Sequence, residues 1–367
     1  MYTLCLSKPV FMSSSFAAIF AVALSEVSAG SLSDYQAVFQ DATELRDRAV
    51  SLDNRWRDST AFLNKSKQAA KNGDYARALS LAEKAKHQYK LAIEQVEINR
   101  NNLENTPFYD ADALPADDIK AIQGFFRDKF PHLSDNDFAN GFYAMAPVMR
   151  VNWEAIEEFP PYVPAIEEGE ELWQTTFKDG KGYGYCFTGP DIMTDYPRWD
   201  AESGTVETLP MAINACRKDH GEQPLVYGKP PIIALQAYIA YKSRGNPTFV
   251  EIPVEDDHAL KAYREGKKFY FSRRGQLNMA CYHCHFFNAG MNIRANVLSP
   301  ALGQTTHWPV YRSKWGEMGT LHRRYKGCNK QVRATPFDLQ SQEYRNLEYF
   351  HTFISNGISV NGPGSRF

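Results

Sequence analysis

The sequence has almost no net charge and hardly any long hydrophobic run. Its formal charge at pH 7 is -2 over 367 residues, so no broad cationic surface is expected, and nucleic acid is excluded as the main partner. Only residues 10–24 form an extended, mostly apolar run. That run is too short to cross a bilayer as a permanent helix. We therefore expect a mature chain without a membrane span.

The apolar run has the surroundings of an export signal. Lys8 precedes it, and the small residues Ser28 and Ala29 follow it. A basic residue, a short apolar core and small residues are typical of a secretion signal. We predict a signal peptide over residues 1–29, cleaved after Ala29, and a mature protein outside the cytoplasm. A retained membrane anchor is the alternative.

Cysteine is scarce too. The chain has six, and Cys5 leaves with the signal peptide. The other five are Cys186, Cys216, Cys281, Cys284 and Cys328. An odd number in an oxidising compartment indicates either one free thiol or cysteines with tasks other than disulfide formation.

Residues 36–103 are highly charged, almost free of glycine and proline, and carry two apolar stripes with helical spacing. The stripes are Val38, Ala42, Leu45, Ala49, Leu52, Trp56, Ser59 and Leu63, and then Ala78, Ala82, Ala85, Tyr89, Ala92 and Val96. Asn72 and Gly73 suit a turn between them, and Asp74 suits the cap of the second helix. The pattern predicts an antiparallel helical hairpin. A helical spacer or a single tetratricopeptide-like unit is the alternative.

The rest of the chain contains an internal echo. Residues 104–165 begin with the proline and aspartate content of a linker. Beyond them, "EGEELWQ" and "EGKKFYF" each place an aromatic residue four positions after a glycine, at Trp173 and Tyr270. An aromatic-rich helical stretch that ends near a glycine follows each one. The pattern predicts a mainly α-helical body of two related modules, residues 166–250 and 251–367.

The second module contains "CYHCH" at residues 281–285. Two thiols three positions apart can each add to one vinyl group of the same porphyrin, and the next histidine can bind the iron. Cys281 and Cys284 are therefore the predicted haem attachments, and His285 is the predicted axial ligand. The other histidine and the methionines of residues 278–291 are expected not to bind the iron.

Paired cysteines also occur in two other kinds of site. A zinc site would need a second Cys-x-x-Cys or a histidine pair, and the sequence has neither. A thioredoxin-like redox pair does not call for a histidine at position 285. Haem attachment is the interpretation that uses all three side chains.

The second axial ligand has two candidates. Met318 can supply the thioether found in electron-transfer cytochromes. Cys328 competes with it, because Cys186 and Cys216 can pair inside the first module and leave Cys328 as the unpaired thiol. Its basic neighbours favour a thiolate and an anionic substrate. These neighbours are Arg323, Arg324, Lys326 and Arg333.

The sequence resembles the SoxA family, the cytochrome subunits of the bacterial thiosulfate-oxidising Sox system. The resemblance covers about residues 107–367. It rests on "NWEAIEEFPPYVPAIEEGEELW" (residues 152–173), "RRGQLNMACYHCH" (residues 273–285) and "GQTTHWPVYRSKWGEMGTLHRRYKGCNKQVRA" (residues 303–334).

The resemblance implies two tandem cytochrome c-like modules and one covalent haem c. The first module would lack haem and hold a Cys186–Cys216 disulfide. In the second, Cys281 and Cys284 would attach the haem, and His285 would be the proximal ligand. Cys328 would be the distal ligand and the catalytic cysteine persulfide. Arg324 would bind the substrate.

The resemblance also implies an activity and partners. The activity would be that of a periplasmic L-cysteine S-thiosulfotransferase, which couples thiosulfate oxidatively to a carrier cysteine. The partners would be a SoxX-type small cytochrome c and a SoxY–SoxZ-type sulfur carrier. An exported electron-transfer cytochrome with Met318 on the iron is the alternative. Residues 54–95 resemble SoxK, a small helical protein that binds the SoxA and SoxX pair, so we expect the hairpin to serve assembly.

Intact-protein mass spectrometry with peptide mapping tests these expectations together. We expect one covalent haem, one Cys186–Cys216 disulfide and a sulfur adduct on Cys328, because each modification changes the mass of a different peptide. In a Cys328→Ser control the haem and disulfide masses should persist and the adduct should vanish. A chain without haem, or a Cys328 that is unmodified both at rest and with thiosulfate, would contradict the corresponding assignment.

Overall fold

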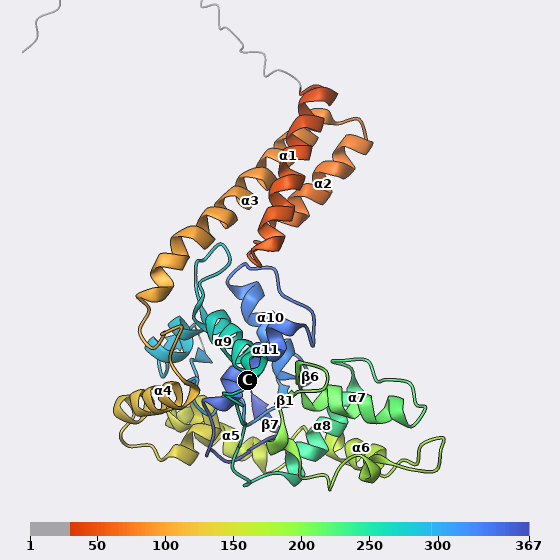
Figure 1. Cartoon of the computed structure of the whole chain (residues 1–367), viewed down its shortest axis with the longest axis vertical. Coiled ribbons are helices and arrows are strands. Elements are labelled where there is room, and N and C mark those ends of the chain that lie inside the picture. Colours follow the sequence, from red (N-terminus) through yellow and green to blue (C-terminus); the bar gives the residue numbers. More distant parts are fainter. Residues whose placement is uncertain (1–29, 295, 367) are drawn as a thin grey trace, which may run out of the picture.

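The computed structural model describes residues 30–294 and 296–366. Three helices form a bundle that projects from a larger body of helices and short strands (Figure 1). The predicted mainly α-helical fold is confirmed. The predicted signal peptide, residues 1–29, lies outside the described residues. Within the described ranges, no helix has the length and apolar character that crossing a membrane requires.

The predicted hairpin is a three-helix bundle. Its helices are α1 (Leu32–Ser51), α2 (Ser59–Lys71) and α3 (Tyr75–Glu104). The prediction of one helix through the first apolar stripe was wrong, because the chain turns back at residues 52–58. Asp53 has a left-handed φ of 51° there, which a continuous helix does not allow.

The second apolar stripe forms the inside of this bundle. Ala78, Ala82, Ala85, Tyr89 and Ala92 are all fully buried, and α3 packs against both α1 and α2. Small side chains let helix axes approach closely. The turn after α2 is as predicted, and the Asp74 side chain caps α3 by accepting a hydrogen bond from the Arg77 backbone N–H.

The first module has its own elements and its own core. Its elements are α6 (Val163–Trp173), η2 (Tyr183–Tyr185), η3 (Met193–Asp195), β1 (Arg198–Asp200), β2 (Thr205–Glu207), α7 (Leu209–Asp219) and α8 (Pro230–Lys242). β1 and β2 form an antiparallel hairpin. Phe177, Tyr183, Ile213, Leu235 and Ile239 are among the buried side chains of this core.

The second module recruits helices from an earlier part of the chain. Those helices are α4 (Pro115–Lys129), η1 (Asp135–Ala144) and α5 (Pro147–Glu157). Ile122 and Phe126 of α4 and Phe138 of η1 join the same buried core as the second module. Residues 104–165, of which only the start was predicted as a linker, therefore contribute helices to the haem-motif module.

The remaining elements of the second module surround the cysteine motif. They are α9 (Asp257–Phe271), η4 (His283–Phe287), β3 (Asn292–Ile293), β4 (Asn296–Val297), β5 (Val310–Arg312), β6 (Glu317–Gly319), α10 (Leu321–Gln331), α11 (Gln342–Phe353) and β7 (Gly364–Arg366). β5 pairs antiparallel with β6 and parallel with β7, which bears the last described residues. The β3–β4 hairpin follows η4.

The internal echo corresponds to two equivalent helix pairs. α6 packs on α8, and α9 packs on α11. At each crossing a glycine lies against a backbone carbonyl. A Cβ on Gly169 would overlap the carbonyl oxygen of Ala234, and a Cβ on Gly266 would overlap that of Asn346. The prediction of two related modules in tandem is confirmed by this shared geometry.

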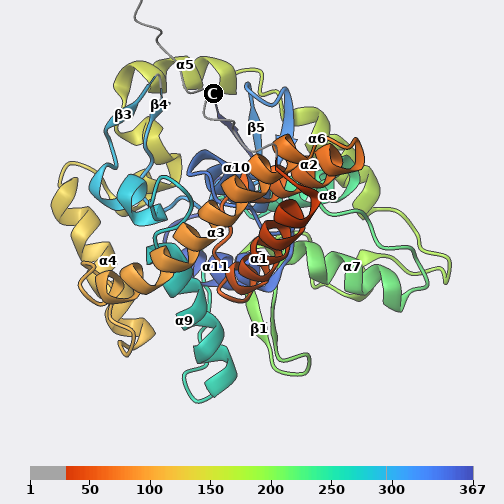
Figure 2. The same cartoon turned by 90° about the horizontal axis from the view of Figure 1, so that it is seen from above.

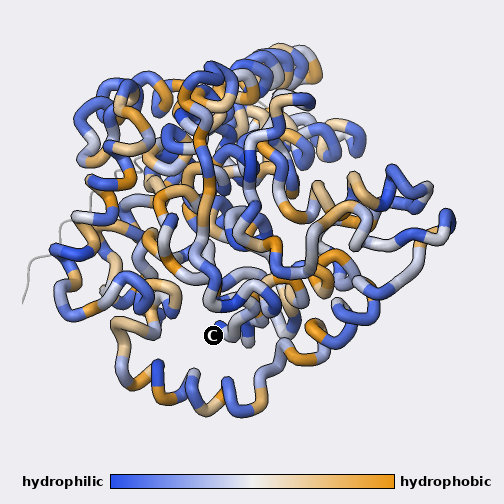
Figure 3. Tube along the Cα trace, turned by 60° about the horizontal axis from the view of Figure 1, so that its bottom comes forward, coloured by the Kyte–Doolittle hydropathy of each residue, from blue (hydrophilic) through white to orange (hydrophobic). Residues whose placement is uncertain are grey.

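The bundle lies over one side of the body. Seen from above, it covers α10 and α11 (Figure 2). Hydrophobic and hydrophilic residues alternate along the outer helices of the body (Figure 3). Apolar burial in two separate cores holds the body together.

Gly266→Ala tests the close approach of α9 to α11. We expect the free energy of unfolding to fall by at least about 1–3 kcal/mol. The added methyl group overlaps a backbone oxygen, and a change of side-chain rotamer cannot relieve that overlap. The matched control is Gly124→Ala in α4, where an added Cβ meets nothing within 4 Å. That change should raise the free energy of unfolding by about 0.5–1 kcal/mol. Urea unfolding of both haem-loaded variants gives the comparison, and equal effects would contradict the packing argument.

Candidate functional site

The cysteine motif follows α9 after the turn of residues 272–280. Cys281, Cys284 and Cys328 are the free thiols of the described chain. His283 does not turn toward them: its Nδ1 accepts a hydrogen bond from the Ala280 backbone N–H at 3.0 Å, and its ring lies 4.0 Å from that of Tyr282. The geometry agrees with the expectation that His283 is not an iron ligand.

His285 is held in one orientation. Its Nδ1 lies 2.8 Å from the carbonyl oxygen of Ser299 and 3.2 Å from Nε2 of Gln304. A carbonyl partner favours the tautomer with the proton on Nδ1 and leaves Nε2 as the free base. Burial lowers the pKa of His285 to about 4, so the imidazole is neutral at physiological pH. A neutral imidazole with a fixed tautomer is the form that binds a metal.

Tyr270 lies within electrostatic reach of all three thiols. Its side chain is 1% exposed, and its hydroxyl has no hydrogen-bond partner among the described residues. The pKa of Tyr270 is raised well above its usual value, first by burial and then by the charges of Cys281, Cys284 and Cys328. The fold therefore brings Cys328, far along the chain, into electrostatic reach of the same tyrosine as the motif cysteines.

Cys281 and Cys284, the two cysteines of the motif, are kept in the thiol form. Burial is the main reason that the pKa of Cys281 rises to about 12, and burial also raises the pKa of Cys284. The Cys328 charge raises both further, and Arg324 acts on Cys284 in the opposite direction. Two protonated thiols one helical turn apart are suited to addition across vinyl groups.

Arg324 differs from the other cations near Cys328. It precedes Cys328 by one turn of α10, and its charge acts on both Cys284 and His285. Arg323 instead forms an ion pair with Glu317 at 2.8 Å and covers the Trp315 ring at 4.3 Å. Of these two arginines, Arg324 thus belongs to the site, and Arg323 binds Glu317 of β6.

The other two basic residues near Cys328, Lys326 and Arg333, have partners away from the thiols. Lys326 Nζ lies 3.7 Å from a carboxylate oxygen of Asp338. Arg333 is exposed, and its Nη1 donates to Oε1 of Gln276 at 3.3 Å. The expected cluster of four cations around Cys328 is therefore mainly Arg324.

The fold adds arginines that the sequence pattern did not single out. Arg312 of β5 lies opposite Arg366 of β7 in the parallel pairing. The charges of Arg324 and Cys328 both act on Arg312, whose pKa burial lowers to about 10. Arg366 is buried against the Tyr143 ring, 4.8 Å from its centroid. The sequence alone could not bring these strands together, because their pairing is long-range.

Met318 lies in a different environment. It is on β6 and packs against the hydrophobic core of the first module. Its backbone oxygen accepts a hydrogen bond from Arg323 at 3.4 Å. The structure therefore favours Cys328 over Met318 as the residue that faces the haem motif.

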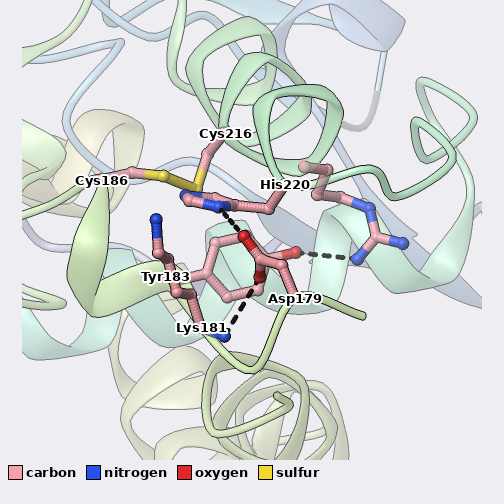
Figure 4. Close-up of a disulfide and its surroundings, with 7 residues drawn as sticks. Asp179, Lys181, Tyr183, Cys186, Cys216 and His220 are labelled. Atoms are coloured by element: carbon pink, nitrogen blue, oxygen red, sulfur yellow. Dashed lines mark hydrogen bonds and ion pairs between the residues drawn. A yellow bond between two sulfur atoms is a disulfide. The ribbon is translucent and has the colours of Figure 1, made fainter. Parts of the chain in front are cut away.

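Cys186 and Cys216 form the predicted disulfide, with their Cα atoms 5.9 Å apart (Figure 4). His220 lies close enough to both sulfurs for a three-ligand metal site, with all three atoms within 4.8 Å. Its Nδ1 is however 2.7 Å from Asp179, and both sulfurs are used in the S–S bond. The cluster is a covalent cross-link that ties the exposed Cys186 to Cys216 in the core of the first module.

Comparisons with known proteins agree with this geometry. The family model for the SoxA/TsdA cytochrome c domain matches residues 168–248. The L-cysteine S-thiosulfotransferase subunit SoxA of Allochromatium vinosum is 60% identical over 255 residues, which cover 69% of this chain and 91% of that protein. The protein of the same name from Chlorobaculum tepidum is 49% identical, over 69% of this chain and 88% of its own length. The chain belongs to the SoxA family.

A solved structure also resembles this SoxA chain. The crystal structure of SoxXA from P. pantotrophus matches with a TM-score of 0.52 and 31% sequence identity. The match covers 57% of this chain and 79% of that one. It supports the cytochrome c-like fold of the body.

The family match fits haem c as the cofactor of this SoxA chain. The matched stretch 168–248 lies in the first module and has no Cys-x-x-Cys-His, so there it shows the fold and not a second haem. The donor set of the second module fits haem: two free thiols, a neutral histidine and a buried tyrosine hydroxyl converge beside aromatic rings.

Paired variants test the second axial ligand of this SoxA chain. We expect Cys328→Ser to change the low-spin ferric EPR signals of the bound haem, because thiolate and hydroxyl ligands differ in field strength. Met318→Leu, a swap of similar volume, should leave those signals unchanged. Loss of a Met-type signal in Met318→Leu with no change in Cys328→Ser would reverse the assignment.

Proposed function

We propose that this chain is the catalytic cytochrome subunit of an L-cysteine S-thiosulfotransferase. It couples the sulfane sulfur of thiosulfate to a cysteine thiol of a SoxY–SoxZ-type carrier. The name of the Allochromatium vinosum relative supports the activity. The single observation that carries the proposal is that Cys328 and Arg324 lie one turn apart on α10, within electrostatic reach of the haem motif.

The overall reaction is an oxidation. The thiosulfate dianion and a carrier thiol give the carrier S-thiosulfonate anion, two electrons and one proton. An S–S bond forms between the sulfane sulfur and the carrier cysteine, and the S–H bond of the carrier breaks. Haem c supplies one-electron acceptance, so we assign the second electron to a SoxX-type small cytochrome, in keeping with the SoxXA complex of P. pantotrophus.

Arg324 has the chemistry to hold the substrate. A guanidinium group binds a sulfonate through paired charge-assisted hydrogen bonds. Because Arg324 lies one turn before Cys328 on α10, an anion bound at Arg324 would present its outer sulfur toward Cys328. Positioning of this kind converts a bimolecular encounter into a reaction within one complex.

Cys328 is the proposed site of covalent sulfur chemistry. In the oxidative half, its terminal sulfur, carried as a persulfide, forms an S–S bond to the sulfane sulfur of thiosulfate and two electrons leave. In the second half, the carrier thiolate attacks that sulfane sulfur, and the Cys328 persulfide anion departs with the bonding pair. The second half involves no net oxidation, as in thiol–disulfide exchange.

The proposal also includes the haem ligands, the cellular location and the domain division of the chain. Cys281 and Cys284 attach the single haem, His285 and Cys328 are its axial ligands, and the first module binds none. The mature chain works in the periplasm after removal of residues 1–29. In the proposed domain division, residues 36–103 form a three-helix bundle, and residues 166–250 and 251–367 remain the two modules. The helices of residues 104–165 pack with the second module.

The activity is tested with the haem-loaded chain, a SoxX-type cytochrome, a SoxY–SoxZ-type carrier and thiosulfate. We expect thiosulfate-dependent reduction of haem. We also expect the mass of the carrier cysteine to increase by that of one S2O3 group. Haem reduction with an unmodified carrier would instead favour the pure electron-transfer alternative.

Arg324→Gln tests substrate binding. Loss of a charge-assisted pair of hydrogen bonds should lower kcat/KM for thiosulfate by roughly tenfold to a hundredfold, mainly through KM. The matched control is Arg323→Gln, which removes the same charge from the neighbouring position but breaks contacts with Glu317, Trp315 and the Met318 carbonyl oxygen. Similar losses in both variants would show a general field effect and contradict a specific role for Arg324.

A further inference from the structure

Hydrogen bonds between the α1–α3 bundle and the described part of the body go to two short segments, residues 273–279 and 330–335, which we call the bundle seat. The first segment ends two residues before Cys281. The second begins two residues after Cys328. The bundle is therefore fixed to the chain immediately beside both proposed cysteine ligand segments.

The α1–α2 turn holds the second segment through its backbone. The Arg57 N–H donates to the carbonyl oxygen of Arg333 at 2.9 Å, and the Thr335 N–H donates to that of Arg55 at 2.8 Å. Trp56 forms a β-bridge with Ala334. These contacts follow α10 at its carboxyl end, and α10 carries Cys328.

Helix α3 holds the first segment through side-chain amides. Gln95 Nε2 donates to the carbonyl oxygen of Gly275 at 2.9 Å and to Oδ1 of Asn278 at 3.0 Å. Asn99 Nδ2 donates to the same Oδ1 at 2.9 Å. Gln95 and Asn99 are each only 8% exposed. Polar side chains buried in a helix interface normally have a structural or functional use.

Gln95 also connects the two parts of the bundle that touch the seat. Its Oε1 accepts hydrogen bonds from Nδ2 of Asn54 at 2.8 Å and from Nε1 of Trp56 at 3.1 Å. One amide thus makes four hydrogen bonds, two within the bundle and two to the segment before Cys281. Because Trp56 bridges to Ala334, Gln95 joins both seat segments.

The two seat segments are also paired with each other. The Leu277 N–H donates to the carbonyl oxygen of Val332 at 3.2 Å. Gly275 has a left-handed φ of 68° and lies so close to Val332 that a Cβ would overlap its carbonyl oxygen. Arg274 Nη2 donates to the carbonyl oxygen of Asp53 at 3.0 Å, and its charge acts on Cys281. The seat is a single packed unit.

We infer that the α1–α3 bundle is a positioning element for the haem ligands, and that Gln95 is its main positioning residue. By fixing the seat, it sets the placement of α10, and hence of Cys328, relative to the segment that begins with Cys281. Supporting contacts of this kind hold ligands within the narrow geometry that a metal site requires. The inference rests on the proposed ligation by Cys328.

The test uses the full-length, haem-loaded chain. Gln95→Leu removes all four hydrogen bonds at similar side-chain volume. Gln95→Glu keeps an acceptor for Asn54 and Trp56 but removes both donors to the seat. The control is Ser66→Ala, because the buried Ser66 hydroxyl donates only within the bundle, to the carbonyl oxygen of Ala78 at 2.8 Å.

We expect both Gln95 variants to show an added set of low-spin ferric EPR signals and a shifted haem midpoint potential. Amide exchange over residues 273–279 and 330–335 should become about tenfold faster, the factor expected for the loss of buried hydrogen bonds. Ser66→Ala should speed exchange in α2 and α3 and leave the haem signals unchanged. Asn99→Ser, a milder change at the same contact, should show a smaller shift.

Three outcomes would overturn the inference. Faster exchange in the seat with unchanged EPR signals and potential would make the bundle a structural cover only. Equal haem changes in Ser66→Ala and Gln95→Leu would indicate general destabilisation. A wild-type spectrum without thiolate ligation would overturn the proposed ligand itself, and that spectrum is recorded before any variant is compared.

Discussion

The haem-motif module depends on one close backbone contact, between Gly266 of α9 and the Asn346 carbonyl of α11. Only a glycine permits this approach, and the approach fixes the end of α9, from which the cysteine motif continues. It also places Tyr270, one turn later, among the buried aromatic rings beside Phe286 and Phe350. Tyr270 thus takes its position from this one helix crossing.

The first module has the same glycine-to-carbonyl helix contact but no haem motif. Gly169 meets Ala234 as Gly266 meets Asn346, so both modules share a frame. Where the second has a haem motif, the first has the Cys186–Cys216 cross-link and a core of its own. A disulfide that closes a loop restricts the unfolded chain, which suits a module that has no cofactor motif to organise its core. Fold and function are separated within one chain.

Charge near the thiols is more selective than the basic run suggests. Arg323 and Arg324 are adjacent in sequence, but on a helix adjacent residues point about 100° apart. One therefore pairs with Glu317 at the protein surface, and the other faces Cys284 and His285. The strand pair β5 and β7 adds Arg312 and Arg366 from outside the run. Site electrostatics here result from secondary structure as much as from composition.

The sequence by itself determined the local features. The Cys-x-x-Cys-His spacing, the glycine-aromatic echo and the turn at Asn72 and Gly73 follow from short-range geometry, and the unpaired Cys328 follows from a count of the cysteines, so all could be predicted. The tertiary structure decided the rest. It broke the first helix at residues 52–58, because that turn is held by contacts with residues 330–335. It packed Met318 against the core of the other module and joined Gln95 to the segment before Cys281. Such contacts join residues far apart in the chain, and no local pattern records them.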